Sequence, residues 1–274
     1  MNFDFNEEQT MIMDGIARYI REEYDFDRRR SIIESDSAYS DDVWRQFSEL
    51  GWLSIPFDES YGGFGGHADD LAGVMLELGK GLIIEPYMST VVVFGSLLNA
   101  SNNDSLKEQL IPRIINGQYK GSFAYAEEQS RFEISDVKTS AQKCGDGYKL
   151  NGTKIAVIDA KESDGLIVTA RTGGSQYGAE GISLFLVDTS AEGVAVSSYN
   201  TMDSHSSSTI NLENVFVTEA NLIVHEGEGF RHIESCLPQI LLCLSAEALG
   251  IMEVLNKLTV EYSKTRKQFG APIG

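Results

Sequence analysis

The chain has few residues of the kinds that bind metals or form disulfides. Its 274 residues include three cysteines and four histidines. Cys144, Cys236 and Cys243 are odd in number and widely spaced, which argues against a disulfide framework. Cys236 and Cys243 stand in an apolar, helix-like run, so we expect them to be small buried hydrophobes. The histidines show no metal-ligand spacing, and we predict no metal site.

Basic residues are also scarce. The chain carries 22 Lys and Arg against 41 Asp and Glu, for a formal net charge of −19. Basic clusters are confined to residues 28–30 and 264–267. Because proteins neutralise nucleic-acid phosphates with clustered Lys and Arg, we predict no nucleic-acid partner. The acidity itself is typical of a well-solvated surface.

Targeting and membrane signals are missing as well. The first residues, "MNFDFNEEQT", carry acids where a signal peptide would be basic. The longest apolar candidate, "LIIEPYMSTVVVFGSLL", is broken by Glu85 and Pro86. No apolar run is therefore expected to reach the roughly 18 residues that span a bilayer. We expect a cytoplasmic protein without membrane insertion.

The first part of the chain, residues 6–117, shows helical periodicity. Asn6 is a candidate N-cap, followed by two acids and by apolar residues at spacings of three and four. A second helical pattern, "DDVWRQFSELGWL", stops at Gly51, where a C-terminal glycine is expected. Further helices are predicted over residues 68–80, 88–100 and 104–116.

Residues 121–228 change to short runs rich in β-branched and aromatic residues. "YKLNGTKIAVI" is a hairpin candidate with Asn151-Gly152 at its tip, since these residue types tolerate a positive φ. Four more strands are predicted in "DGLIVTART", "GISLFLVDT", "GVAVSSYN" and "STINLENVFV". No helical crossover of the length that a parallel sheet requires separates them. An antiparallel barrel or sandwich is the better prediction.

Residues 229–263 return to helical periodicity in one long run. Its apolar residues form more than one stripe, so the helix needs partners on more than one side. The sequence thus predicts an α+β multidomain chain. Its parts are an N-terminal all-α bundle (1–120), a middle antiparallel β domain (121–228) and the first helix of a C-terminal helical bundle (229–274).

The local sequences, in this order, resemble the flavin-dependent acyl-CoA dehydrogenase family. The resemblance covers essentially the whole chain and is carried by "FNEEQTMIMDGIARYI", "WRQFSELGWLSIPFDESYGGFGG", "YKLNGTKIAVIDAKESDGLIVTART" and "TVEYSKTRKQFGAPIG". Within the family, "DESYGGFGG", "EPYMSTVV" and "VEYSKTRKQFGAPIG" are most similar to the small subunit of pimeloyl-CoA-type dehydrogenases. The resemblance also implies that the C-terminal helical domain is truncated here, with further helices expected beyond Gly274.

The resemblance implies a reaction and a cofactor. In the family a Glu removes the proton α to a thioester carbonyl while the β-hydride passes to FAD, which gives a trans-2-enoyl-CoA. Electrons then leave through an electron-transfer flavoprotein, in fatty acid metabolism and β-oxidation. The subgroup suggests a medium-chain acyl-CoA substrate, with a dicarboxylic one as an option.

No catalytic residue is assigned. Most family members carry the base in later helices of the C-terminal domain. A minority carry it at the position that aligns with Ile240, and isoleucine cannot abstract a proton. Glu247 and Glu253 lie further along the same helix, where we expect surface or packing-edge acids.

The flavin-binding motifs of the family are only partly present. Glu127 matches the acid of a Thr-Glu-Pro motif, but Ala126 and Glu128 replace its neighbours. Residues 131–133, Arg-Phe-Glu, stand where the family has Gly-Ser-Asp, and residues 156–158, Ala-Val-Ile, where it has Trp-Ile-Thr. The larger side chains at residues 131–133 argue against a complete flavin site. The loss of the Trp ring and the Thr hydroxyl at residues 156–158 argues against it as well.

One cofactor motif is intact. Arg266 and Phe269 match the family's Arg-x-x-Phe-Gly, which reaches across a dimer interface to the adenine-dinucleotide end of the neighbouring subunit's flavin. An Arg fork suits phosphate oxygens and a Phe ring offers a flat face. The alternative is a helix C-terminus whose Lys264, Arg266 and Lys267 merely complement the helix dipole.

These observations predict one subunit of a hetero-oligomeric acyl-CoA dehydrogenase, with acyl-CoA as substrate and a second dehydrogenase-type subunit as partner. Two alternatives stay open. The chain could be a self-sufficient homomeric dehydrogenase, or a non-catalytic structural or binding partner that keeps the fold.

Overall fold

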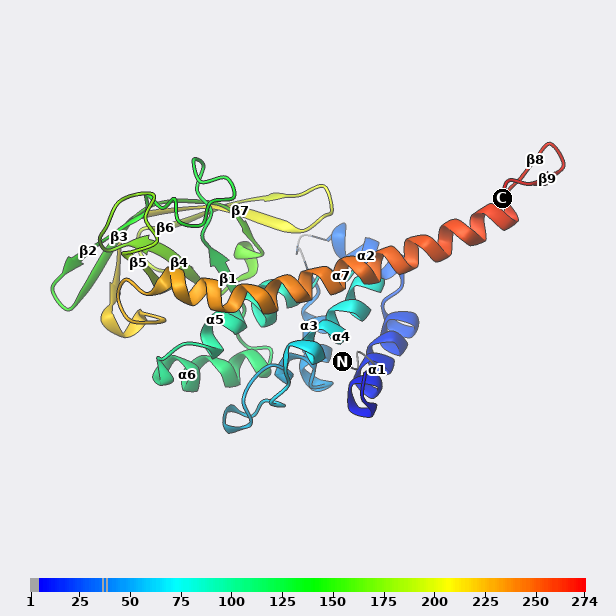
Figure 1. Cartoon of the computed structure of the whole chain (residues 1–274), viewed down its shortest axis with the longest axis horizontal. Coiled ribbons are helices and arrows are strands. Elements are labelled where there is room, and N and C mark those ends of the chain that lie inside the picture. Colours follow the sequence, from blue (N-terminus) through cyan, green and yellow to red (C-terminus); the bar gives the residue numbers. More distant parts are fainter. Residues whose placement is uncertain (1–4, 36, 38) are drawn as a thin grey trace.

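The N-terminal part of the chain is a layer of helices (Figure 1). The structure, a computed structural model, describes residues 5–35, 37 and 39–274. The longer helices of this layer are α1 (Glu7–Glu23), α2 (Phe26–Ile33), α3 (Asp41–Glu49), α4 (Ala68–Lys80), α5 (Gly95–Asn99) and α6 (Asp104–Ile115). Short helical turns η1 (Trp52–Ser54), η2 (Glu59–Tyr61) and η3 (Met88–Phe94) connect them.

The helix boundaries follow from local capping. The Asn6 side chain accepts a hydrogen bond from the Gln9 amide, and Gln9 returns one to the Asn6 amide, as the predicted N-cap requires. Gly51 ends α3 with φ 77, a conformation that glycine adopts without strain. The helices predicted over 68–80 and 104–116 are confirmed. The one predicted over 88–100 is confirmed as η3 and α5, although η3 is a π-helix.

The helices enclose a continuous apolar core. Its centre is an aromatic group in which the Phe47 ring lies 5.1 Å from Trp52 and 5.8 Å from Tyr19, both centroid to centroid. Burial of such rings dominates the stability of a layer of this kind. The helical layer therefore provides a packed support for β4 (Gly165–Arg171), β5 (Ile182–Asp188) and α7 (Gly229–Thr265), which contribute residues to the same core.

Residues 121–228 form a curled sheet. Its strands are β1 (Gly121–Ala124), β2 (Ser140–Cys144), β3 (Gly147–Ile158), β4 (Gly165–Arg171), β5 (Ile182–Asp188), β6 (Val194–Asn200) and β7 (Ser206–Thr218). The order is β1-β4-β2-β3-β7-β6, with β5 paired to β4. The predicted strands are confirmed, and most neighbours are antiparallel. Two pairings depart from the antiparallel pattern, because β1 and β2 pair with β4 in parallel.

The turn predicted at Asn151-Gly152 is wrong. Both residues lie inside β3, which pairs with β7 on both sides of a register shift. The hairpin between β2 and β3 turns instead at Gly145, whose φ is 63. Gly152 is required for a tertiary reason, since a Cβ there would lie 2.4 Å from Thr139 Oγ1.

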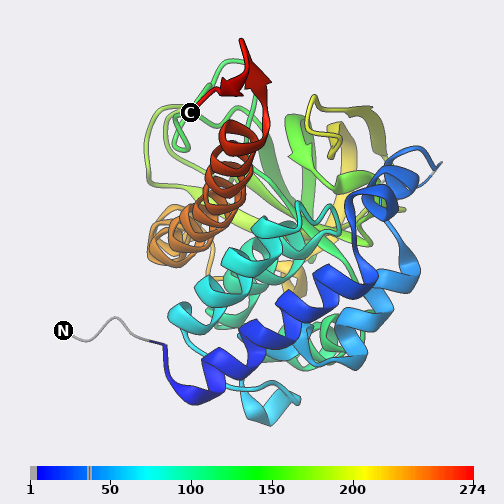
Figure 2. The same ribbon diagram turned by 90° about the vertical axis from the view of Figure 1, so that its right-hand side faces the viewer.

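The last long element, α7 (Gly229–Thr265), extends beyond the rest of the chain (Figure 1). Figure 2 views the chain from that end and shows α7 lying beside α4. Cys236 and Cys243 are buried, as predicted. Nine large apolar residues of α7 are at least 40% exposed: Leu241, Leu242, Leu244, Leu249, Met252, Leu255, Leu258, Val260 and Tyr262. This exposure matches the expectation that the helix needs partners on more than one side.

The expectation that no segment is long and apolar enough to span a membrane is wrong on those two criteria. Among the described residues, α7 meets both, and 17% of its most apolar stretch is buried within the chain. Length and composition are weak evidence by themselves, because core helices meet the same criteria. Cytoplasmic location, absence of membrane insertion and the domain limits at residues 120 and 228 stay predictions.

Candidate functional site

The hairpin at the end of α7 carries the two predicted cofactor residues. Arg266 is the C-cap of α7, and the strands β8 (Lys267–Gln268) and β9 (Ala271–Pro272) follow it. Phe269 and Gly270 make the turn with φ values of 51 and 85. The Phe269 side chain is fully exposed, and the Arg266 guanidinium has no hydrogen-bond or ion-pair partner among the described residues. Both side chains are thus free to contact a molecule outside this chain.

Only part of this arrangement is explained by the helix dipole. Lys264, in the last turn, already lies 3.4 Å from the Glu261 carboxylate. A dipole role needs charge in the last turn but gives no reason for an exposed ring at Phe269. The hairpin lies at the end of the molecule away from the β domain (Figure 1). The structure therefore does not bring Arg266 and Phe269 together with the other family-type positions of the same chain.

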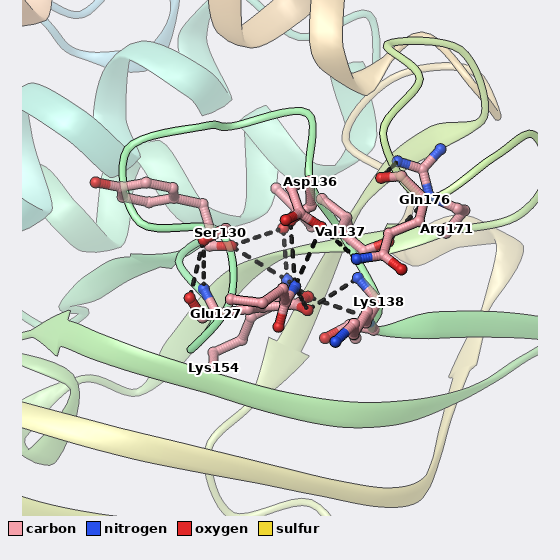
Figure 3. A network of polar contacts seen from close by, with 12 residues as sticks. Glu127, Ser130, Asp136, Val137, Lys138, Lys154, Arg171 and Gln176 are labelled. Carbon is pink, nitrogen blue, oxygen red and sulfur yellow. Dashed lines mark hydrogen bonds and ion pairs between the residues drawn. The ribbon is translucent and has the colours of Figure 1, made fainter.

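A buried ion pair organises the segment that follows β1 (Figure 3). Lys154 Nζ donates to Glu127 Oε1 at 2.7 Å and to Thr169 Oγ1 at 2.7 Å. The Lys154 side chain is fully buried and that of Glu127 is 4% exposed. The amides of Lys138 and Thr139 also donate to Glu127, at 2.8 and 3.0 Å. Glu127 therefore links the strand β3 to both ends of the 127–139 segment.

The same segment is held by a second set of polar contacts. Gln176 Nε2 donates to Asp136 Oδ1 at 2.7 Å, and Arg171 donates to the carbonyls of Ser135 and Val137. These contacts are drawn on the right of the network in Figure 3. The segment is accordingly fixed although it has no regular secondary structure.

The electrostatics of the ion pair keep Glu127 charged. Burial would raise the pKa of its carboxyl, but the Lys154 charge and the hydrogen bonds outweigh burial and lower that pKa to about 2. Burial lowers the pKa of Lys154 to about 8, against the opposing effect of Glu127. The carboxylate is thus engaged within the fold, and its acceptors are used for structure.

The positions that align with the family's flavin-binding motifs are called the flavin wall below. They lack the groups that a flavin would need. Ala126, Ala156 and Ile158 have no side-chain donor or aromatic ring. Phe132, which stands at the Ser of Gly-Ser-Asp, is 99% exposed, and Arg131 adopts φ 48. The structure places bulk in that turn, as the sequence indicated.

The three candidate base positions lie on α7 in different surroundings. Ile240 packs against the helical core. Glu253 is 49% exposed and lies 3.2 Å from Lys80 Nζ, which agrees with a packing-edge acid. Glu247 differs, because it lines a cavity, and burial raises the pKa of its carboxyl. None of them is placed beside the Glu127 network by a contact in the structure.

That cavity measures about 450 Å³ and lies between α4, α7, η3 and the turn of β6 and β7. Two buried acids, Glu85 and Asp159, line it together with Glu247. Sequence reasoning treated Glu85 only as a break in an apolar run and passed over Asp159. An acid inside "LIIEPYM" and one after the strand "AVI" were the available signals.

Glu85→Gln is expected to stabilise the protein at high pH. Burial raises the pKa of Glu85 from 4.5 to about 7, so ionisation is more costly in the folded than in the unfolded state. Below pH 4.5 the wild type has its full free energy of unfolding relative to the variant. It loses this free energy as the pH rises from 4.5 through 7. At pH 8 the variant should be more stable by about 3 kcal/mol. Urea unfolding at pH 4.5 and 8 measures this, and equal differences at both would contradict it.

Comparison with known proteins gives a consistent assignment. Sequence models of the acyl-CoA dehydrogenase N-terminal domain and middle domain match residues 6–118 and 122–215. A protein of Bacillus subtilis (strain 168), "Probable acyl-CoA dehydrogenase YngJ", is 30% identical over 278 residues, which cover 100% of this chain and 73% of that protein.

Solved structures of similar shape include flavoproteins and a heteromeric complex. The FAD complex of PigA has a TM-score of 0.91 at 25% identity, covering 100% of this chain and 73% of its own. The ChsE4-ChsE5 complex from Mycobacterium tuberculosis has a TM-score of 0.89 at 25% identity, covering 100% of this chain and 71% of its own. The helical layer, the curled sheet and the long helix α7 thus form an acyl-CoA dehydrogenase-like fold.

The chain's own residues fit FAD unevenly. The wall positions lack side-chain donors, and the Glu127 carboxylate is occupied by Lys154 and two amides. The hairpin of Arg266 and Phe269 offers a guanidinium without a partner among the described residues and a fully exposed ring, which suit a phosphate and an aromatic base. The wall therefore does not fit the isoalloxazine, whereas the hairpin fits the opposite end of the cofactor.

Proposed function

The chain belongs to the acyl-CoA dehydrogenase family, whose cofactor is FAD, and on that premise we propose that it is the non-catalytic partner within a hetero-oligomeric dehydrogenase. The complex would convert an acyl-CoA thioester to trans-2-enoyl-CoA. The second subunit would hold the flavin and the base, and this chain would complete the flavin site. FAD supplies a hydride acceptor when bound; a flavoprotein carrier would take the electrons onward.

The observation that carries this proposal is the contrast between the two ends of the molecule. At one end, Ala126, Ala156 and Ile158 offer no flavin contacts. At the other, Arg266 and Phe269 are presented at the tip of a 37-residue helix with no partner among the described residues. The residues suited to contact another subunit's flavin are therefore present, whereas the residues that would hold a flavin of the chain's own are missing.

The roles of the two hairpin residues follow from their chemistry. The five N–H donors of a guanidinium can bind two phosphate oxygens at once, so Arg266 would hold the pyrophosphate. The Phe269 ring would lie against the flat adenine. Exposed apolar residues of α7 would be covered in the complex, since patches of this kind mark interaction sites.

Arg266→Ala is expected to reduce FAD retention in the complex of this chain with its partner subunit. Loss of hydrogen bonds to a charged group costs about 1.5–3 kcal/mol, or about 10- to 100-fold in affinity. The measurement is flavin absorbance of the co-expressed complex together with FAD dissociation constants.

Lys267→Ala is the matched control for this variant, because it removes a charge from the next residue, which is also exposed. It should leave the FAD dissociation constant nearly unchanged. Equal FAD affinity in Arg266→Ala and the wild-type complex would rule out the cross-subunit role. Loss of FAD in both variants would show that the net positive charge of the hairpin matters, and not the paired N–H donors of Arg266.

A further inference from the structure

The cavity between α4 and α7 has an apolar body. Its walls include Met75 and Leu78 from α4, and Leu244, Ala248 and Ile251 from α7. The volume of about 450 Å³ lies within the usual range of small-molecule sites. An aliphatic chain would therefore find complementary surface in it.

One end of the cavity is acidic and poorly neutralised. Glu85 is 3% exposed; its Oε1 accepts from the Ser40 amide at 3.3 Å, and its Oε2 has no hydrogen-bond partner within the described part of the chain. Asp159 is 7% exposed and accepts from Ser89 Oγ at 2.6 Å. Glu247 and Asp203 line the same cavity. A buried carboxylate oxygen without a partner is costly, and a ligand donor would remove that cost.

Two basic residues, Arg29 and His205, line the cavity against four acids. Arg29 donates to the carbonyl oxygens of Leu82 and Asp203, at 2.7 and 3.1 Å. Lys80, on α4, is paired with Glu77 and Glu253, outside the cavity lining. His205, in the turn of β6 and β7, is the remaining basic residue of the lining.

The ionisation of the acids reflects this imbalance. Burial raises the pKa of Glu85 to about 7 and that of Asp159 to about 6. For Asp159 the nearby Glu162 and Asp203 add to the effect, while Ser89 and His205 oppose it. Tyr24, from the α1 side, opposes the rise at Glu85 through a side-chain hydrogen bond, while burial and then the Glu85 charge raise the pKa of Tyr24. A cation beside these acids would restore their charged forms.

We propose that this cavity binds a small aliphatic ligand that carries an ammonium group, with the alkyl chain against α4 and α7 and the ammonium beside Glu85 and Asp159. The cavity lies apart from the Arg266–Phe269 hairpin, although Ile158, one of the flavin-wall positions, and Glu247 line it. The cavity also disfavours a dicarboxylic ligand, because the four acids of its lining outnumber its two basic residues, Arg29 and His205.

Hexylammonium, hexan-1-ol and hexanoate are suitable probes, since they share a chain and differ in charge. Calorimetric titration of the chain at pH 7.5 should show hexylammonium binding at least about 10-fold tighter than hexan-1-ol, as expected for a hydrogen bond to a charged group. Hexanoate should bind more weakly than both. Hexylammonium affinity should rise from pH 5 to pH 8, because the acids ionise while the amine, with a pKa near that of Lys, stays protonated.

Variants locate the site. Glu85→Gln and Asp159→Asn should each lower hexylammonium affinity at least about 10-fold and leave hexan-1-ol binding nearly unchanged. Glu234→Gln, an exposed acid on α7 outside the cavity, is the matched control. If a buried variant does not fold, Ala248→Phe should block all three probes from the α7 side. Equal affinity for hexylammonium and hexan-1-ol, tighter hexanoate binding, or unchanged affinity in the acid variants would overturn the proposal.

These outcomes are separable from the proposed function. Probe binding uses the chain without flavin, partner or acyl-CoA. Loss of the ammonium preference would leave the FAD contact of Arg266 untouched, and an unchanged FAD affinity in Arg266→Ala would leave the cavity proposal standing.

Discussion

Replacing Lys154 with methionine is expected to lower the free energy of unfolding by about 4 kcal/mol. The change leaves the buried Glu127 carboxylate without the cation that lies 2.7 Å away. Removal of one partner from a buried pair is costly because the other charge stays desolvated. The loss should also loosen the 127–139 segment, since Glu127 accepts from two of its amides. Urea unfolding followed by near-ultraviolet circular dichroism measures the effect.

A double variant and a surface variant test the cause. Glu127→Gln combined with Lys154→Met removes both charges and should recover part of the loss. Lys143→Met breaks an exposed pair with Glu219 and should shift the unfolding midpoint little, because solvent screens such pairs. If Lys154→Met unfolds at the wild-type midpoint, the buried pair does not stabilise the segment.

Gly250→Ala is expected to destabilise the chain by about 3 kcal/mol and to displace α7 from α4. A Cβ at Gly250 would lie 2.0 Å from the Leu76 carbonyl oxygen, closer than a real Cβ contact allows. Gly79 faces α7 in the same way, since its Cβ would lie 2.3 Å from the Glu247 carbonyl oxygen. The two helices therefore cross with their backbones in contact. Urea unfolding and limited proteolysis within α7 measure the change.

Gly15→Ala is the matched control. A Cβ at Gly15, on α1, meets nothing within 4 Å. That change should stabilise the helix by about 1 kcal/mol, since alanine favours helix over glycine. A Gly250→Ala variant as stable as the wild type, with no new cleavage in α7, would contradict the crossing. Displacement of α7 should also move Arg266, which α7 carries, and so weaken FAD retention in the complex.

Features set by neighbouring residues were predictable from the sequence. The Asn6 cap, the glycine at the end of α3 and the strands β4 to β7 depend on local hydrogen bonds and on hydrophobic period. The order of helices, sheet and long helix also follows from these signals. Arg266 and Phe269 were found by resemblance, and their exposure agrees with a contact to another molecule.

Features that depend on distant segments were not predictable. Gly152 resembled a turn residue, but it is needed because Thr139 packs against β3. The crossing at Gly79 and Gly250 joins residues 171 positions apart in the sequence, and nothing local marks it. Glu85 and Asp159 line the same cavity only because the helical layer and the sheet pack together. Tertiary contacts therefore decide these roles.

The FAD content of the chain purified alone is the most direct test of the central claim. If the chain's own wall does not hold the isoalloxazine, the chain should purify without flavin absorbance. The complex with the partner subunit should then contain FAD that an acyl-CoA substrate reduces. A chain that purifies alone with equimolar FAD, and reduces an electron acceptor when given acyl-CoA, would contradict the account and establish a self-sufficient dehydrogenase.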